Sequence, residues 1–224
     1  MMGCAILLRA QDGHQFDAYE AKPLRSRRGG IVLLQEIFGV TSHIKSVCDG
    51  YAEAGYHVVA PSLFDRLGKD LVLGYSKEDA AKGRDWRSKI PWSNTEADVL
   101  AAVHYLLDAG KIATVGYCWG GTVSWRCAAH IDLLAAAVCY YPTQIAGFVA
   151  DQPRCPVLMH FGESDPIATV EHAQLLRASH DQRVDIQLYP ASHGFNCSEI
   201  SGFHAPSAEL ALRRTLEFLN AHVG

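Results

Sequence analysis

A cysteine occupies the turn that follows a short apolar run in 112-IATVGYCWGGTVSW-125. Gly116 and Gly120 stand two residues before and two residues after Cys118, and a helix-like segment starts directly after it. This spacing is typical of a nucleophile elbow, a sharp strand-to-helix turn that requires small neighbours because it crowds the backbone. The N-terminus of the following helix would favour a thiolate. The motif alone is weak, since Cys118 could also be a small apolar side chain at a strand end.

A cysteine nucleophile needs a base and an acid that orients the base. His193 lies in 189-YPASHGFN-196, and Asp165 lies in 161-FGESDP-166. The chain order of nucleophile, acid and histidine is that of the α/β-hydrolases. The imidazole would take the thiol proton and later protonate the leaving group, while the carboxylate would hold the imidazole tautomer. Glu163 is an alternative acid, and His193 could instead be an ordinary loop histidine.

Backbone N–H groups would stabilise the oxyanion that forms during acyl transfer. We assign one donor to Trp119, directly after the elbow, and the second to Ile37, in the loop after the first parallel strand. Glu36 precedes Ile37 and is a single carboxylate at the end of an apolar run. It could act on the nucleophile, or it could be a solvated glutamate at a strand end.

Apolar periodicity and turn residues predict a strand-rich chain in which strands and helices alternate. The predicted strands are 4–9, 16–21, 30–36, 56–60, 111–117, 135–141, 155–161 and 184–189, and the predicted helices are 41–55, 93–110, 119–130, 169–180 and 206–222. Asp12-Gly13 predicts a hairpin between the first two strands, and Ser93 with Glu96 predicts a capping box. Uninterrupted apolar runs predict strands buried on both faces, as in a parallel sheet.

This order predicts one α/β domain over residues 1–224, with a mostly parallel, doubly wound sheet, helices on both faces and an antiparallel N-terminal hairpin. Active sites of such sheets lie at the carboxyl ends of the strands. We therefore expect the topology to bring Glu36, Cys118, Asp165 and His193 to one edge of the sheet.

Composition excludes several classes of protein. The chain has 224 residues, a net charge of −4, 49% hydrophobic residues and 20% charged residues, so neither disorder nor nucleic-acid binding is expected. We interpret the basic cluster 25-RSRR-28 as a solvated loop. The apolar start is too short for a signal peptide, and no run is long enough to span a bilayer. Seven cysteines without a C-x-x-C pair predict a reducing, cytoplasmic setting with no disulfide framework and no metal site.

Six segments together resemble the dienelactone hydrolase family, whose members are carboxymethylenebutenolidase-like enzymes of the α/β-hydrolase superfamily. They are 33-LLQEIFGV-40, 57-HVVAPSLF-64, 114-TVGYCWGG-121, 139-CYYP-142, 156-PVLMHFGESDP-166 and 192-SHGFN-196. The resemblance implies hydrolysis of an ester or enol-lactone through an acyl-cysteine, without a cofactor. It also implies that Glu36 contacts the resting thiol, and that substrate binding displaces Glu36 so that its carboxylate helps to form the thiolate.

The chain departs from the family where the substrate is recognised. Typical members carry an arginine shortly after the catalytic histidine, and the stretch after His193 has none. We expect Trp86, Tyr141, Arg84 and Phe195 to contact a small-molecule ester or lactone. The alternatives are a broad-specificity carboxylesterase or thioesterase, and a non-catalytic ligand-binding protein of the same fold. We expect a monomer or a weak homo-oligomer, with no membrane partner.

Overall fold

The computed structural model describes residues 3–24, 27–180 and 183–224. Residues 25 and 26 of the predicted basic loop lie outside this description. The chain divides into two compact units, Met1–Ile112 and Ala113–Gly224, and each is described by itself.

The first unit contains four strands in the order β1-β2-β4-β3. Their bounds are β1 (Cys4–Arg9), β2 (Gln15–Ala21), β3 (Gly30–Leu34) and β4 (His57–Pro61). The predicted hairpin is confirmed, because β1 pairs antiparallel with β2. Strand β2 also pairs antiparallel with β4, whereas β3 and β4 are parallel. Every residue of β3 is buried, as its uninterrupted apolar run predicted.

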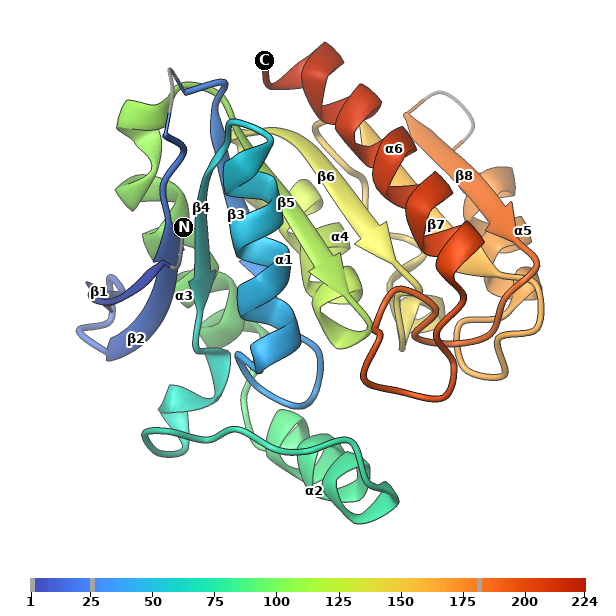
Figure 1. The fold of residues 1–224 in the computed structure, drawn as a ribbon, viewed down its shortest axis with the longest axis horizontal. Coiled ribbons are helices and arrows are strands. Elements are labelled where there is room, and N and C mark those ends of the chain that lie inside the picture. Colours follow the sequence, from blue (N-terminus) through green and yellow to red (C-terminus); the bar gives the residue numbers. More distant parts are fainter. Residues whose placement is uncertain (1–2, 25–26, 181–182) are drawn as a thin grey trace. The chain divides into compact units, whose positions relative to one another are not determined.

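Helices cover both faces of these strands. The unit contains α1 (Ser42–Glu53), η1 (Leu63–Arg66), α2 (Lys77–Ser88), α3 (Trp92–Tyr105) and η2 (Leu107–Ala109). Helix α1 packs on one face and α3 on the other, while α2 lies beyond the strand ends (Figure 1). Thr41 caps α1 by accepting the Ile44 N–H. Gly55, which follows the α1 C-cap, has φ 103°, as expected of a glycine after a helix.

Two local predictions in this unit are wrong, and one helix was missed. Helix α3 begins at Trp92 with Pro91 at its N-cap, so Ser93 lies inside the first turn and the predicted capping box does not form. Strand β3 ends at Leu34, two residues earlier than predicted. Helix α2 was not predicted, because it buries only Gly83 and therefore has no apolar stripe.

The second unit contains four strands in the order β5-β6-β7-β8. Its elements are β5 (Ile112–Tyr117), α4 (Trp119–His130), β6 (Leu134–Tyr140), η3 (Ile145–Phe148), β7 (Val157–Gly162), α5 (Val170–Ser179), β8 (Val184–Tyr189) and α6 (Ala205–His222). Strands β6, β7 and β8 are parallel. Helix α6 covers one face of these strands, and α4 and α5 cover the other (Figure 1). All residues of β5 and β7 are buried, as predicted.

No helix in the described part of the chain is both long enough and apolar enough to cross a membrane.

Candidate active site

Cys118 is the residue between β5 and α4, and it has a strained backbone. Its φ is 55° and its ψ is −116°, which is rare for a residue with a side chain. Three backbone hydrogen bonds hold this conformation. The Cys118 N–H donates to the Tyr140 carbonyl at 3.0 Å, and the Cys118 carbonyl accepts from Gly121 at 3.0 Å and from Thr143 at 3.2 Å. The end of β6 and the loop after it therefore stabilise the turn.

The glycines around Cys118 permit this sharp turn. A Cβ atom on Gly116 would lie 1.9 Å from the Gly120 carbonyl oxygen, which is impossible for real atoms. A Cβ atom on Gly121 would lie 2.8 Å from the Tyr140 carbonyl oxygen. Gly116 and Gly121, on either side of Cys118, are thus required by close backbone contacts.

The side chains of Cys118, His193 and Asp165 form one chain of contacts within the second unit. His193 Nδ1 lies 2.7 Å from Asp165 Oδ2, and His193 Nε2 lies 3.4 Å from Cys118 Sγ. With a proton on Nδ1, the imidazole donates to the carboxylate and leaves Nε2 able to accept the thiol proton. The Cys118 residue is 6% exposed and the Asp165 side chain is fully buried.

The loop after β7 fixes the Asp165 carboxylate. Its Oδ1 atom accepts backbone N–H groups from Ile167 at 2.7 Å and from Ala168 at 2.9 Å. The Asp165 N–H in turn donates to the Gly162 carbonyl. One carboxylate oxygen is therefore held by the backbone, and the other is directed to the histidine.

Backbone hydrogen bonds join the acid loop to the histidine loop. The Glu163 N–H donates to the Tyr189 carbonyl at 2.8 Å, and the Ser164 N–H donates to the Ala191 carbonyl at 3.0 Å. Glu163 is exposed, and its backbone lies in this junction. Of the two candidate acids, the structure pairs Asp165 with His193.

The surroundings of His193 favour its protonated form while Cys118 is a thiolate. Burial by itself lowers the pKa of His193, but the negative charge on Cys118 and the hydrogen bonds to Asp165 and Cys118 outweigh it and raise the pKa to about 10. The Tyr141 ring meets the imidazole edge-on, with centroids 5.1 Å apart, and Phe195 packs against Tyr141 at 5.3 Å. Tyr141 and Phe195 are both fully buried.

The remaining predicted residues lie in three places. Trp119 opens α4 and is 1% exposed. Glu36 and Ile37 lie in the first unit, on the loop after β3, and are 3% and 7% exposed. On α2, the Trp86 ring packs edge-on against Phe64 at 5.5 Å, whereas Arg84 is exposed.

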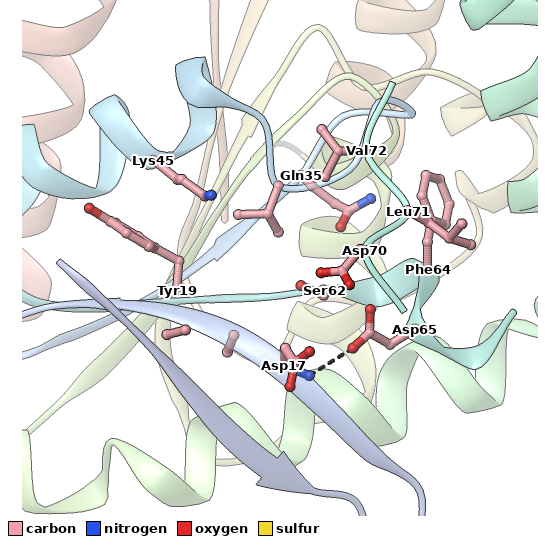
Figure 2. A pocket seen from close by; sticks show the side chains of 13 residues that line it. Asp17, Tyr19, Gln35, Lys45, Ser62, Phe64, Asp65, Asp70, Leu71 and Val72 are labelled. Carbon is pink, nitrogen blue, oxygen red and sulfur yellow. Dashed lines mark hydrogen bonds between the residues drawn. The ribbon is translucent and has the colours of Figure 1, made fainter. Parts of the chain in front are cut away.

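A cavity in the first unit has a volume of about 170 Å³. Figure 2 shows it lined by Asp17, Lys45, Gln35 and Asp70, among other side chains, and shows the hydrogen bond from the Asp17 N–H to Asp65. None of the predicted site residues lines this cavity, and no motif in the sequence indicated it. Among the described residues, no three His, Cys, Asp or Glu side chains come close enough together to hold a metal ion.

Comparisons with known sequences and structures all point to the same family of proteins. The sequence model of the dienelactone hydrolase family matches residues 16–223. A candidate carboxymethylenebutenolidase of Yersinia pestis is 32% identical over 98% of this chain and 88% of its own length. The carboxymethylenebutenolidase of Pseudomonas putida is 29% identical over 98% of this chain and 97% of its own length. A crystal structure of a candidate dienelactone hydrolase from Klebsiella pneumoniae superposes with a TM-score of 0.83 at 26% identity, covering 96% of this chain and 98% of that one.

Proposed function

Because the chain belongs to the dienelactone hydrolase family, has the α/β-hydrolase fold and is a hydrolase of carboxylic esters or lactones, we propose that it works through an acyl-cysteine on Cys118. His193 is the general base and acid of this mechanism, and Asp165 orients His193. The observation that carries the proposal is the contact chain from Asp165 Oδ2 to His193 Nδ1 at 2.7 Å and from His193 Nε2 to Cys118 Sγ at 3.4 Å.

The reaction has two balanced halves. In the first, His193 Nε2 takes the thiol proton, the sulfur attacks the carbonyl carbon, and the bond to the leaving oxygen breaks as that oxygen receives the proton. In the second, His193 removes a proton from water, the hydroxide attacks the thioester, and the carboxylic acid is released as the C–S bond breaks and the departing sulfur takes the proton back from His193. The negative charge of Asp165 stabilises the imidazolium that forms in both halves.

Two N–H groups stabilise the tetrahedral oxyanion in this proposal, those of Trp119 and Ile37. The position of Trp119 supports its role, because it is the first residue of α4 and directly follows Cys118, and the positive end of a helix dipole at its N-terminus favours a negative charge there. For Glu36 we propose assistance to the nucleophile, as the family resemblance implies. Its burial supports the proposal, since a desolvated carboxylate is a stronger base than a carboxylate in water.

The substrate is proposed as a small ester or lactone, with a dienelactone-like compound as the first candidate. A broad carboxylesterase or thioesterase remains the second candidate, because the stretch after His193 contains no arginine to grip a substrate carboxylate. Trp86 and Arg84, both on α2, are the proposed substrate contacts. Tyr141 and Phe195 are also proposed substrate contacts, and their rings pack in series against the His193 ring.

A substrate panel tests the proposal. Esters, lactones and thioesters, each with and without a carboxylate, are assayed on the wild type and on Cys118→Ala. We expect hydrolysis by the wild type alone, and a mass increase equal to the acyl group on the intact wild-type protein during turnover. Equal hydrolysis by both proteins would overturn the acyl-cysteine mechanism. A preference for substrates with a carboxylate would favour the dienelactone-like candidate over the broad esterase.

Three further proposals rest on the sequence. They are that residues 1–224 act as a single domain, that the protein is a monomer or a weak homo-oligomer, and that it works in the cytoplasm. A single cooperative unfolding transition and a monomeric elution volume are the expected measurements for the first two.

A further inference from the structure

Helix α2 approaches the loop after β3 unusually closely. A Cβ atom on Gly83 would lie 2.1 Å from the Ile37 carbonyl oxygen, 3.0 Å from the Ile37 carbonyl carbon and 3.2 Å from the Ile37 Cβ atom. Gly83 is also the only residue of α2 that is buried. Glycine is unfavourable in the interior of a helix. Its presence at position 83 is explained by the close backbone contact, which a residue with a side chain would prevent. The backbone of Ile37 is therefore one contact between the helix and the rest of its unit, and the Trp86 ring, which packs against Phe64, is another.

The segment before Gly83 holds the next residue of the same loop. The Leu73 N–H donates to the Phe38 carbonyl at 2.9 Å. The Phe38 and Tyr75 rings also pack together, with centroids 4.6 Å apart. These contacts fix both the backbone and the side chain of Phe38, directly after Ile37.

Two more contacts continue along the loop. Gly39 has φ 87°, and a Cβ atom there would lie 2.5 Å from the Leu71 carbonyl oxygen. Thr41 Oγ1 lies 3.0 Å from the Tyr75 hydroxyl oxygen, within hydrogen-bonding distance. We call residues 71–83 the brace and residues 36–41 the donor loop. Four positions of the donor loop, from Ile37 to Thr41, thus contact the brace.

We propose that the brace fixes the orientation of the Ile37 peptide, and that Gly83 is a positioning residue for ester hydrolysis. This inference rests on the proposed function, in which the Ile37 N–H stabilises the oxyanion. A donor of this kind lowers the barrier only if it is oriented before the charge develops. The donor loop is a connecting segment, and such segments are ordinarily more mobile than the strands that they follow. The close contact of Gly83 with the Ile37 carbonyl restricts rotation of the backbone at Ile37.

The substitution Gly83→Ala tests this inference. The added methyl group must displace either the helix or the Ile37 carbonyl, so the Ile37 N–H loses its orientation. Loss of a complete oxyanion donor lowers kcat by roughly 100- to 1000-fold. We expect displacement to lower kcat by at least about tenfold. The KM should change by less than about threefold, because the donor acts on the transition state and not on bound substrate.

A matched control exists in α1. Gly50 also lies within a helix, and a Cβ atom there meets no other atom within 4 Å. Gly50→Ala should leave kcat unchanged and raise the Tm by about 2–4 °C, because alanine favours helix and the site has room. The two substitutions are chemically identical, so a difference in kcat between them isolates the contact with Ile37.

Two measurements separate positioning from general damage. The rate at which iodoacetamide alkylates Cys118 should equal that of the wild type, since alkylation forms no oxyanion. In stopped-flow kinetics, acylation and deacylation should slow by similar factors, since both pass through a tetrahedral oxyanion. Unequal factors, or a changed alkylation rate, would contradict the inference.

Tyr75→Ala is the second variant if Gly83→Ala does not fold. It removes the ring contact with Phe38 and the hydroxyl group near Thr41, and Tyr75 is only half-buried. We expect the same fall in kcat at nearly constant KM. A folded variant whose kcat is within threefold of the wild type overturns the brace inference alone. Activity in Cys118→Ala would instead overturn the proposed function, so the two failures are distinguishable.

Discussion

The Asp165 carboxylate faces His193 with one oxygen and two backbone N–H groups with the other. Oδ2 lies 2.7 Å from His193 Nδ1, while Oδ1 accepts from Ile167 and Ala168. The two backbone hydrogen bonds to Oδ1 therefore hold the carboxylate in place without a contribution from the histidine. This division also allows the charge and the shape of Asp165 to be changed separately, because an asparagine could keep the two backbone bonds.

Replacement of Cys118 by alanine should abolish ester hydrolysis without unfolding the protein. Loss of the nucleophile is expected to lower kcat by at least about a thousandfold. The three backbone hydrogen bonds that hold the turn do not involve the side chain and should survive. Steady-state kinetics and circular dichroism are the measurements. Activity within tenfold of the wild type would contradict the assignment of Cys118, and unfolding would instead indicate a structural role.

Asp165→Asn should lower kcat by about three to four orders of magnitude. The new amide would donate toward His193 Nδ1, which places the imidazole proton on Nε2 and prevents it from accepting the thiol proton. Glu163→Gln is the control, because Glu163 is exposed while Asp165 contacts the histidine. Its kcat should stay near the wild-type value. The reverse ranking in steady-state kinetics would show that Glu163 is the acid.

Glu36→Gln should slow acylation and leave deacylation nearly unchanged. The glutamine keeps the shape of the side chain but cannot act as a base, so formation of the thiolate should suffer while the fold is retained. Stopped-flow kinetics with a chromogenic ester separate the two steps. A normal acylation burst followed by slow turnover would instead make Glu36 a deacylation residue. This pattern also differs from that expected for Gly83→Ala, in which both steps slow.

His160 should make the protein less stable in acid. Burial lowers the pKa of His160 to about 3, with a smaller contribution from the charge of Arg214, whereas the pKa of an unfolded histidine is about 6.5. The unfolded chain therefore binds a proton that the folded protein excludes. Stability is fully present above pH ~6.5 and declines as pH falls toward 3, by at most about 1.4 kcal/mol per pH unit.

His160→Gln tests this expectation. Glutamine can offer one donor and one acceptor to the Tyr189 and Thr215 hydroxyl groups that His160 contacts at 2.7 and 2.9 Å, but it does not titrate in this range. Urea denaturation between pH 4 and 7 should show a shallower loss of stability with acid than in the wild type. The exposed His104 provides the control, since His104→Gln should leave the slope as it is. An unchanged slope in His160→Gln would refute the prediction.

Most elements could be predicted from local patterns, and the failures have identifiable causes. Strands such as β5 and β7 were predictable because their apolar runs are uninterrupted and the sheet buries both faces. Helix α2 carries no such signal, because Gly83 is its one buried residue and the helix has no apolar stripe. The predicted start of α3 was wrong because Pro91, and not a capping serine, precedes the first turn.

The sequence by itself determined the fold class and the candidate triad. The elbow glycines, the chain order of cysteine, aspartate and histidine, and the six family segments are all local features that a single chain displays. Only the tertiary structure decided that Asp165, and not Glu163, meets His193, and that Gly83 packs on Ile37. Glu163 and Asp165 are two residues apart and chemically alike, so composition cannot separate them. Which of the two meets the histidine depends on how the backbone hydrogen bonds between the acid loop and the histidine loop direct each side chain. These hydrogen bonds join residues that lie far apart in the sequence, so a local pattern cannot predict them.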